Sequence, residues 1–172
     1  MRVILLIAAF AALSACRDEL AEAPDPVPLT EENVSHFCQM NVLEHGGPKA
    51  QIHLEGYPGP IFFAQVRDAV VFLKSPERDA RILATYVSDM GAATSWQQPG
   101  VQNWVDSKAA VYVIETRVAG GMGAPEVVPF MKVGDAQAFA DDYGGRVVAL
   151  ADIPDDAVLG PVNPNAPLEV PR

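Results

Sequence analysis

The chain of 172 residues has little cysteine and little positive charge. Twelve Lys and Arg stand against 22 Asp and Glu, which gives a formal net charge of −10. Nucleic-acid phosphates require clustered Lys and Arg, so this balance argues against a nucleic-acid partner. The same charge would repel an anionic lipid surface. The hydrophobic fraction of 49% is nevertheless enough for the core of one domain or one two-lobed unit.

Common catalytic motifs are also missing from the sequence. We find no G-x-S-x-G nucleophile elbow, no H-E-x-x-H zinc helix and no C-x-x-C redox pair. The sequence therefore predicts a protein that is not an enzyme.

The longest apolar run covers residues 3–13 and is too short to span a bilayer as a mature helix. It follows Arg2 and ends in Leu13-Ser14-Ala15-Cys16, which resembles the bacterial lipoprotein cleavage box. Residues 1–15 are thus predicted to be a signal peptide, with Cys16 lipidated as the first mature residue. This places the protein on the periplasmic face of a Gram-negative membrane, and Arg17 after the cysteine favours the outer membrane.

Lipidation of Cys16 leaves Cys38 without a partner in the chain. An unpaired cysteine outside the cytoplasm indicates either metal ligation or a disulfide-linked dimer. Met40 lies two positions on, and in an extended backbone both side chains would share a face, with Cα atoms roughly 6.5–7 Å apart. Thiolate and thioether together favour Cu(I). The alternative is that both residues are packing elements of a core.

The two ends of the mature chain are rich in proline. Residues 16–33 combine three prolines with acidic side chains and no hydrophobic period, which predicts a solvated tether. Residues 154–172 contain five prolines and predict a poorly ordered tail.

An internal repeat lies between these ends. The pattern F-x-x-V-x-D-A-x-x-F occurs at residues 63–72 and again 67 positions later at 130–139, followed by a second echo of residues 81–84 in 146–149. Strands are expected at 50–54 and 110–116, and helices at about 68–73 and 135–143, with Asp68 and Asp135 at the N-cap or first turn. The predicted fold is α+β: a duplicated β-β-α-β domain over residues 34–153, with lobes at about 34–90 and 104–153.

A loop of the second repeat places Met122 among Gly120, Gly121 and Gly123. A core methionine normally has packing neighbours instead, so Met122 is a better ligand candidate than Met90 or Met131. The alternative is a surface methionine without function. We expect the loop to be mobile in the free protein and ordered by Cu(I).

Several ordered motifs resemble those of the NosL family of nitrous oxide reductase accessory proteins, over residues 37–152. They are Cys38-x-Met40, Tyr86-Val87-Ser88-Asp89, Trp104-Val105-Asp106, Ala110-Val111-Tyr112-Val113, Met122-Gly123, Pro129-Phe130, Asp135-Ala136-x-x-Phe139-Ala140 and Gly144-Gly145-Arg146. The chain departs from the family pattern by an insertion between Asp89 and Trp104, which leaves the roles of Met90 and Trp96 open. His36, His45 and His53 match no secure position.

The resemblance implies a copper-chaperone lipoprotein whose two β-β-α-β repeats are related to the fold of organomercurial lyases. It implies one Cu(I) per monomer, held by Cys38, Met40 and Met122, and delivery of copper for the copper-sulfur centre of nitrous oxide reductase in denitrification. The implied partners are the apo reductase or its membrane-bound maturation machinery. A scaffold lipoprotein that dimerises through its free thiol is the alternative function.

Overall fold

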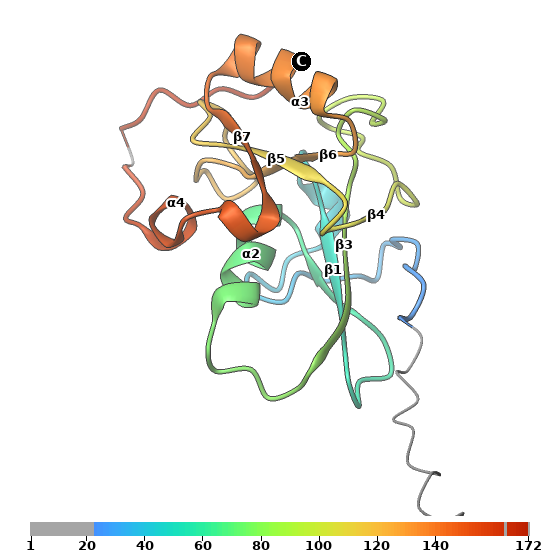
Figure 1. The fold of residues 1–172 in the computed structure, drawn as a ribbon. Coiled ribbons are helices and arrows are strands. Elements are labelled where there is room, and N and C mark those ends of the chain that lie inside the picture. The colour runs from blue at the N-terminus through green and yellow to red at the C-terminus, as the bar shows by residue number, and fades with distance from the viewer. Residues whose placement is uncertain (1–22, 164, 172) are drawn as a thin grey trace, which may run out of the picture.

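The computed structural model describes residues 23–163 and 165–171 (Figure 1). The predicted signal peptide, Cys16 and the first part of the predicted tether lie outside this part of the chain. Within the described residues, no helix is both long and apolar enough to cross a bilayer.

The described chain forms two units, each with the order strand, strand, helix, strand. The first unit consists of β1 (Ala50–Leu54), β2 (Ile61–Phe63), α2 (Val66–Lys74) and β3 (Ile82–Val87), and the second of β5 (Val111–Ile114), β6 (Val128–Phe130), α3 (Val133–Tyr143) and β7 (Arg146–Ala149). Four short elements complete the fold: η2 (Val42–Glu44), β4 (Val105–Asp106), η3 (Leu150–Asp152) and α4 (Asp155–Leu159).

The two units share one topology. Their antiparallel sheets have the orders β2-β1-β3-β4 and β6-β5-β7, so the first strand of each unit is flanked by its second and third. Ala50 pairs with Phe63 in the first unit, and Val111 pairs with Phe130 in the second. The predicted α+β fold with a duplicated β-β-α-β unit is therefore confirmed.

The second sequence match, residues 81–84 with 146–149, does not correspond to equivalent strand positions in the structure. Ala50 pairs with Val87 and Val111 with Ala149, so the ladder makes Val87 the counterpart of Ala149. The sequence pattern instead matched Ala84 with Ala149. The difference arises because the connection from α2 to β3 is longer than the tight connection from α3 to β7.

Both helices begin where the repeat predicts an acidic first turn. Asp68 and Asp135 lie in the first turns of α2 and α3, where a negative charge is favourable, whereas the N-caps are Gln65 and Lys132. Each helix starts two residues before its predicted beginning. Figure 1 shows α3 over the second sheet at one end of the molecule and α2 against β1.

The two units share their main hydrophobic core. It combines Ile52, Phe63 and Val66 of the first unit with Tyr112 and Ile114 of the second. A second cluster under α3 contains Trp96, which is 5% exposed and stacks on Phe139 with ring centroids 6.4 Å apart. The insertion between the units is thus anchored in the core of the second unit.

The predicted tether is packed from Pro24 onward, which corrects the expectation of a solvated segment. The Tyr86 hydroxyl donates to the Pro24 carbonyl at 2.8 Å, and the Val27 amide donates to Gln51 Oε1 at 2.9 Å. Leu29 is buried against Val42 and Phe62. Two apolar side chains in this acidic segment, at positions 27 and 29, are sufficient to fix it to the domain.

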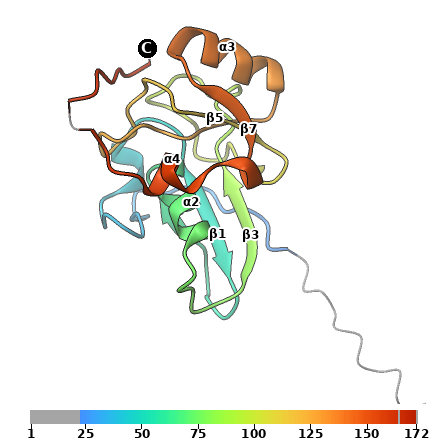
Figure 2. The same cartoon turned by 60° about the vertical axis from the view of Figure 1, so that its left-hand side comes forward.

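The proline-rich tail is also structured, contrary to the prediction of poor order. Residues 155–159 form α4, which lies beside α2 (Figure 2) and buries Val158 in the main core. Further along, Glu169 bridges Val118 in parallel and forms an ion pair with Arg117 at 3.1 Å. Backbone pairing, ion pairs from Lys74 and Arg117, and the buried Val158 therefore hold a segment whose composition contains little to pack.

Candidate metal-binding site

Cys38 lies on a tight turn within residues 34–41. The turn is closed by a bridge between Val34 and Asn41 and by the Ser35 amide, which donates to the Met40 carbonyl at 2.8 Å. The Gln39 amide donates to the Ser35 carbonyl at 2.9 Å, and Gln39 adopts a positive φ of 57°. The backbone therefore reverses between Cys38 and Met40 instead of running extended as predicted.

The turn leaves its sulfur atoms within reach of solvent. The Cys38 side chain is half-buried and forms no disulfide, while Met40 is 38% exposed and the adjacent Phe37 is 48% exposed. These exposures do not fit the alternative in which Cys38 and Met40 are core residues.

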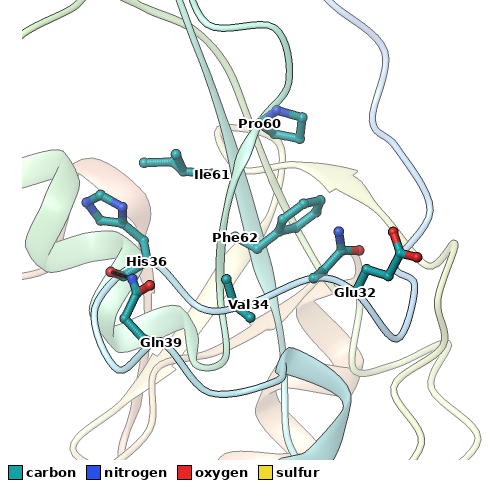
Figure 3. Close-up of a pocket in the computed structure, with 8 residues that line it drawn as sticks. Glu32, Val34, His36, Gln39, Pro60, Ile61 and Phe62 are labelled. Carbon is teal, nitrogen blue, oxygen red and sulfur yellow. Dashed lines mark hydrogen bonds between the residues drawn. The ribbon is translucent and has the colours of Figure 1, made fainter.

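His36 links the turn to β2 and α2 through its backbone amide and its ring. Its amide donates to the Phe62 carbonyl at 2.7 Å, and its ring contacts Phe63 and Phe72 with centroids 5.7 and 5.4 Å away. Figure 3 shows the adjacent groove of about 300 Å³, with His36 and Gln39 on one side and Pro60 and Phe62 on the other. Cys38 is not among the residues that line this groove.

Met122 lies on the loop between β5 and β6. The loop is closed by the Gly120 amide, which donates to the Ala124 carbonyl at 2.8 Å, and Gly123 takes a positive φ of 77°. The Met122 side chain is 50% exposed. Its amide donates to Gln65 Oε1 at 3.2 Å. The backbone of this loop is therefore tied to the first unit, whereas the thioether extends into solvent.

The turn with Cys38 and the loop with Met122 both contact one short segment, residues 62–65, which comprises the end of β2 and its connection to α2. The turn binds this segment at Phe62 and at Ala64, whose amide donates to Ser35 Oγ at 3.2 Å. The loop binds it at Gln65. The structure thus gathers the elements that carry Cys38, Met40 and Met122, although they are far apart in the sequence.

Met90 lies in the connection between the units, and Met131 lies in the second unit just before α3. Met90 is half-buried against the cluster under α3, and its amide donates to the Pro129 carbonyl at 3.0 Å. Met131 is 48% exposed at the start of α3. Neither methionine belongs to residues 62–65, the segment that binds both the Cys38 turn and the Met122 loop.

The remaining histidines have different surroundings. His53 lies in β1, is 7% exposed and contacts Gln51 Oε1 at 3.2 Å, and burial lowers the pKa of its imidazole. His45 has a buried Nε2 without a hydrogen-bond partner and lies against Gly121. In the part of the chain that the structure describes, no three His, Cys, Asp or Glu side chains converge as a metal site.

Two buried charged residues lie behind residues 62–65. Lys49 Nζ donates to the carbonyls of Gly46, Gly47 and Ala64 at 2.9–3.1 Å, and burial lowers its pKa to about 8. Burial raises the pKa of Glu126 to about 7, opposed by the amides of Arg67 and Val127 that bind its Oε1. Sequence reasoning missed Lys49, Gln65 and Glu126, since their roles depend on contacts across the two units.

Comparisons with known proteins point to one family. The family model NosL matches residues 26–158. The chain is 53% identical over 163 residues to the copper-binding lipoprotein NosL of Achromobacter cycloclastes, covering 94% of this chain and 84% of that protein. It is 30% identical over 144 residues to the copper-binding lipoprotein NosL of Stutzerimonas stutzeri, covering 83% and 73%.

A solved structure agrees with these sequence matches. The crystal structure of the copper chaperone NosL from Shewanella denitrificans superposes with a TM-score of 0.70 at 26% identity. The match covers 75% of this chain and 95% of that one. The names of these relatives describe copper-binding proteins and no enzyme, as the sequence predicted for this chain.

Proposed function

The chain belongs to the NosL family, and from this premise we propose that it is a lipoprotein metallochaperone that binds one Cu(I) and delivers it. The destination is the copper-sulfur centre of nitrous oxide reductase. The relatives named as copper-binding lipoproteins support the binding part of this proposal.

The proposed ligands are Cys38, Met40 and Met122. A thiolate and two thioethers form a soft donor set, and soft donors select Cu(I) over harder ions. Thioethers are neutral and weaker donors than a thiolate, so a partner can displace them one at a time. A site of this kind can hold copper and still release it by ligand exchange.

The observation that carries the proposal is the exposure of these three side chains on two loops that share residues 62–65. Cys38 is half-buried, whereas Met40 and Met122 are 38% and 50% exposed. A chaperone must present its metal to a second protein, and a buried site would prevent this exchange. The surface position also agrees with the absence of a disulfide at Cys38.

The proposed partners are the apo reductase or its membrane-bound maturation machinery. Lipidated Cys16 would hold the protein on the periplasmic face of a Gram-negative membrane, with the outer membrane favoured by Arg17. The Tyr86 hydroxyl holds the chain against the domain at Pro24, eight residues after the proposed lipidation site.

Anaerobic titration of the reduced mature chain with Cu(I) tests the proposal. We expect one equivalent to bind and the free thiol to become unreactive, followed by transfer of copper to added apo reductase. Met131→Ala removes an exposed methionine outside the proposed site and serves as the control, which should leave the stoichiometry unchanged. A thiol that stays reactive in the presence of Cu(I), together with a disulfide-linked dimer on oxidation, would instead favour the scaffold function.

A further inference from the structure

Residues 62–65 bear both proposed ligand loops, but they hold them by different means. The turn with Cys38 is bound through backbone and hydroxyl groups at Phe62 and Ala64. The Met122 amide is bound through a side chain, because it donates to Gln65 Oε1 at 3.2 Å. Further along the same loop, the Arg67 guanidinium donates to the Pro125 carbonyl at 3.4 Å and the Arg67 amide donates to Glu126 Oε1 at 3.0 Å. Gln65 is therefore the side chain of the first unit that holds the part of this loop next to Met122.

The Gln65 side chain is buried. Gln65 is 3% exposed at the N-cap of α2. Burial raises the pKa of the nearby Asp68, opposed by the Gln65 side chain. A backbone N–H only donates, so the hydrogen bond from Met122 directs the Gln65 oxygen toward the loop.

The loop approaches Gln65 closely because it begins with glycine. A Cβ atom on Gly120 would lie 2.6 Å from Gln65 Oε1 and 2.7 Å from Glu126 Oε2, which is closer than carbon and oxygen can approach. The next residue, Gly121, lies against His45 in the same way, with a Cβ 3.0 Å from that of the histidine. The first half of the loop is thus packed against the domain, whereas the Met122 side chain is 50% exposed.

The duplicated unit provides a contrast. The repeat aligns Gln65 with Lys132, the N-cap of α3, which is exposed. It also aligns the loop between β5 and β6 with the loop between β1 and β2, where a Cβ atom on Gly59 would have no neighbouring atom within 4 Å. The contact between the β5–β6 loop and Gln65 therefore has no counterpart between the β1–β2 loop and Lys132. At the start of α3 the close neighbour is Gly91 instead, where a Cβ atom would lie 2.5 Å from Asp135 Oδ2.

We propose that Gln65 is a positioning residue for the metal site: its amide oxygen holds the Met122 loop on the segment that also carries the Cys38 turn. This role rests on the proposed Cu(I) site and deepens it. Gln65 does not touch the metal. It acts by holding the Met122 loop on the segment that also binds the Cys38 turn before copper arrives, which reduces the ordering that binding would otherwise require.

The first test uses the metal-free protein and does not depend on copper binding. In Gln65→Ala, hydrogen exchange of the Met122 amide should accelerate about three- to tenfold, as expected for the loss of one hydrogen bond. Lys132→Ala, at the equivalent helix start, should leave this amide unchanged. Unchanged exchange in Gln65→Ala would overturn the proposal even if the wild-type protein binds Cu(I) as expected.

The second test measures Cu(I) affinity by competition with a chelator. Gln65→Ala should weaken binding about three- to tenfold, and Gln65→Ala combined with Met122→Ala should bind no more weakly than Met122→Ala alone. A further loss in the double variant would show that Gln65 does not act through Met122 and would overturn the proposal. If the wild-type protein binds no Cu(I), the proposed function fails, while the exchange result still decides the role of Gln65.

A second variant leaves Gln65 intact and guards against a folding defect. Gly120→Ala forces the loop away from Gln65 Oε1, so it should reproduce both effects of Gln65→Ala. Gly59→Ala is the matched control, since the added methyl group meets open space in the equivalent loop. If Gly120→Ala and Gly59→Ala gave the same Met122 amide exchange and the same Cu(I) affinity, the proposed contact between the loop and Gln65 would be contradicted.

Discussion

At the scale of single residues, the domain keeps a carboxyl group and an ammonium group in its interior. Glu126 is 1% exposed, and its Oε2 has no hydrogen-bond partner, whereas Oε1 accepts from the Arg67 and Val127 amides. Lys49 is fully buried and contributes an opposite charge nearby. An unpaired buried carboxylate is costly, so this carboxyl group prefers to be protonated.

The stability of the protein should therefore depend on pH through Glu126. Its folded-state pKa of about 7 lies above the ordinary value of 4.5, so the folded state retains a proton that the unfolded state has lost. The stabilisation that this bound proton provides is fully present below the unfolded-state pKa. It amounts to about 3 kcal/mol of unfolding free energy and is lost as the pH rises through the folded-state pKa. Lys49, with a pKa of about 8, titrates mainly above this window.

Urea unfolding of Glu126→Gln at a series of pH values measures this effect. We expect the free energy of unfolding to fall with rising pH less steeply in the variant than in the wild type. Glu77→Gln, which changes an exposed carboxylate, should retain the wild-type slope. Identical slopes for Glu126→Gln and the wild type would show that the buried carboxyl does not titrate in this range.

At the scale of elements, the segment that connects the two units packs into the core through Trp96. Trp96 is 5% exposed within the cluster under α3, and its carbonyl accepts from the Gly47 amide at 2.7 Å. A Cβ on Gly47 would lie 2.7 Å from the indole ring. The indole therefore links the insertion to the chain that precedes β1 as well as to the second unit.

Trp96→Ala should destabilise the domain by about 3–5 kcal/mol, as is usual for a large aromatic side chain removed from a core. Tyr57→Ala removes an aromatic side chain that is 49% exposed and should change the unfolding free energy by less than about 0.5 kcal/mol. Chemical denaturation of both variants provides the comparison. A Trp96→Ala variant as stable as Tyr57→Ala would mean that the insertion packs independently of the core.

The elements that sequence reasoning predicts correctly are those with local signals. The strand at residues 50–54 has its predicted bounds, and Asp68 and Asp135 mark the first turns of α2 and α3. The failures depend on distant contacts. The turn at Cys38 is fixed by Phe62, the tail by Val118, and the Met122 loop by Gln65, a residue 57 positions away. No local pattern encodes such partners.

The ligand candidates themselves were accessible from the sequence, because an unpaired cysteine and a glycine-flanked methionine are unusual on chemical grounds. Their arrangement was not accessible. The positive φ of Gln39 and the hydrogen bond from the Ser35 amide to the Met40 carbonyl convert the expected extended pair into a turn. Gln65 carries no sequence signal that separates it from any other helix N-cap.

At the scale of the whole molecule, a proposed lipid anchor is combined with a proposed soft-metal site on the surface. The two cysteines have separate predicted roles, since Cys16 ends the lipoprotein cleavage box and Cys38 is the free thiol of the domain. The proposed route to the lipid is acylation of Cys16, which rests on the sequence Leu13-Ser14-Ala15-Cys16.

Cys16→Ser should abolish acylation and release the protein from the membrane fraction. Cys38→Ser provides the control, because it should remain acylated and membrane-bound while losing its metal site. Fractionation and mass spectrometry of both variants decide the point. A wild-type protein recovered in the soluble fraction without acyl mass would contradict the lipoprotein interpretation.

The central claim is that Cys38 dominates a Cu(I) site completed by Met40 and Met122. Cys38 supplies the only anionic sulfur, and its ligation releases a proton, so binding should also weaken as the pH falls. The thioethers are neutral and should each contribute less than the thiolate.

Competition of each variant with a Cu(I) chelator tests this claim most directly. We predict that Cys38→Ser abolishes tight one-to-one binding, that Met40→Ala and Met122→Ala weaken it with the fold intact, and that Met131→Ala has no effect. Unchanged affinity in Cys38→Ser would contradict the account.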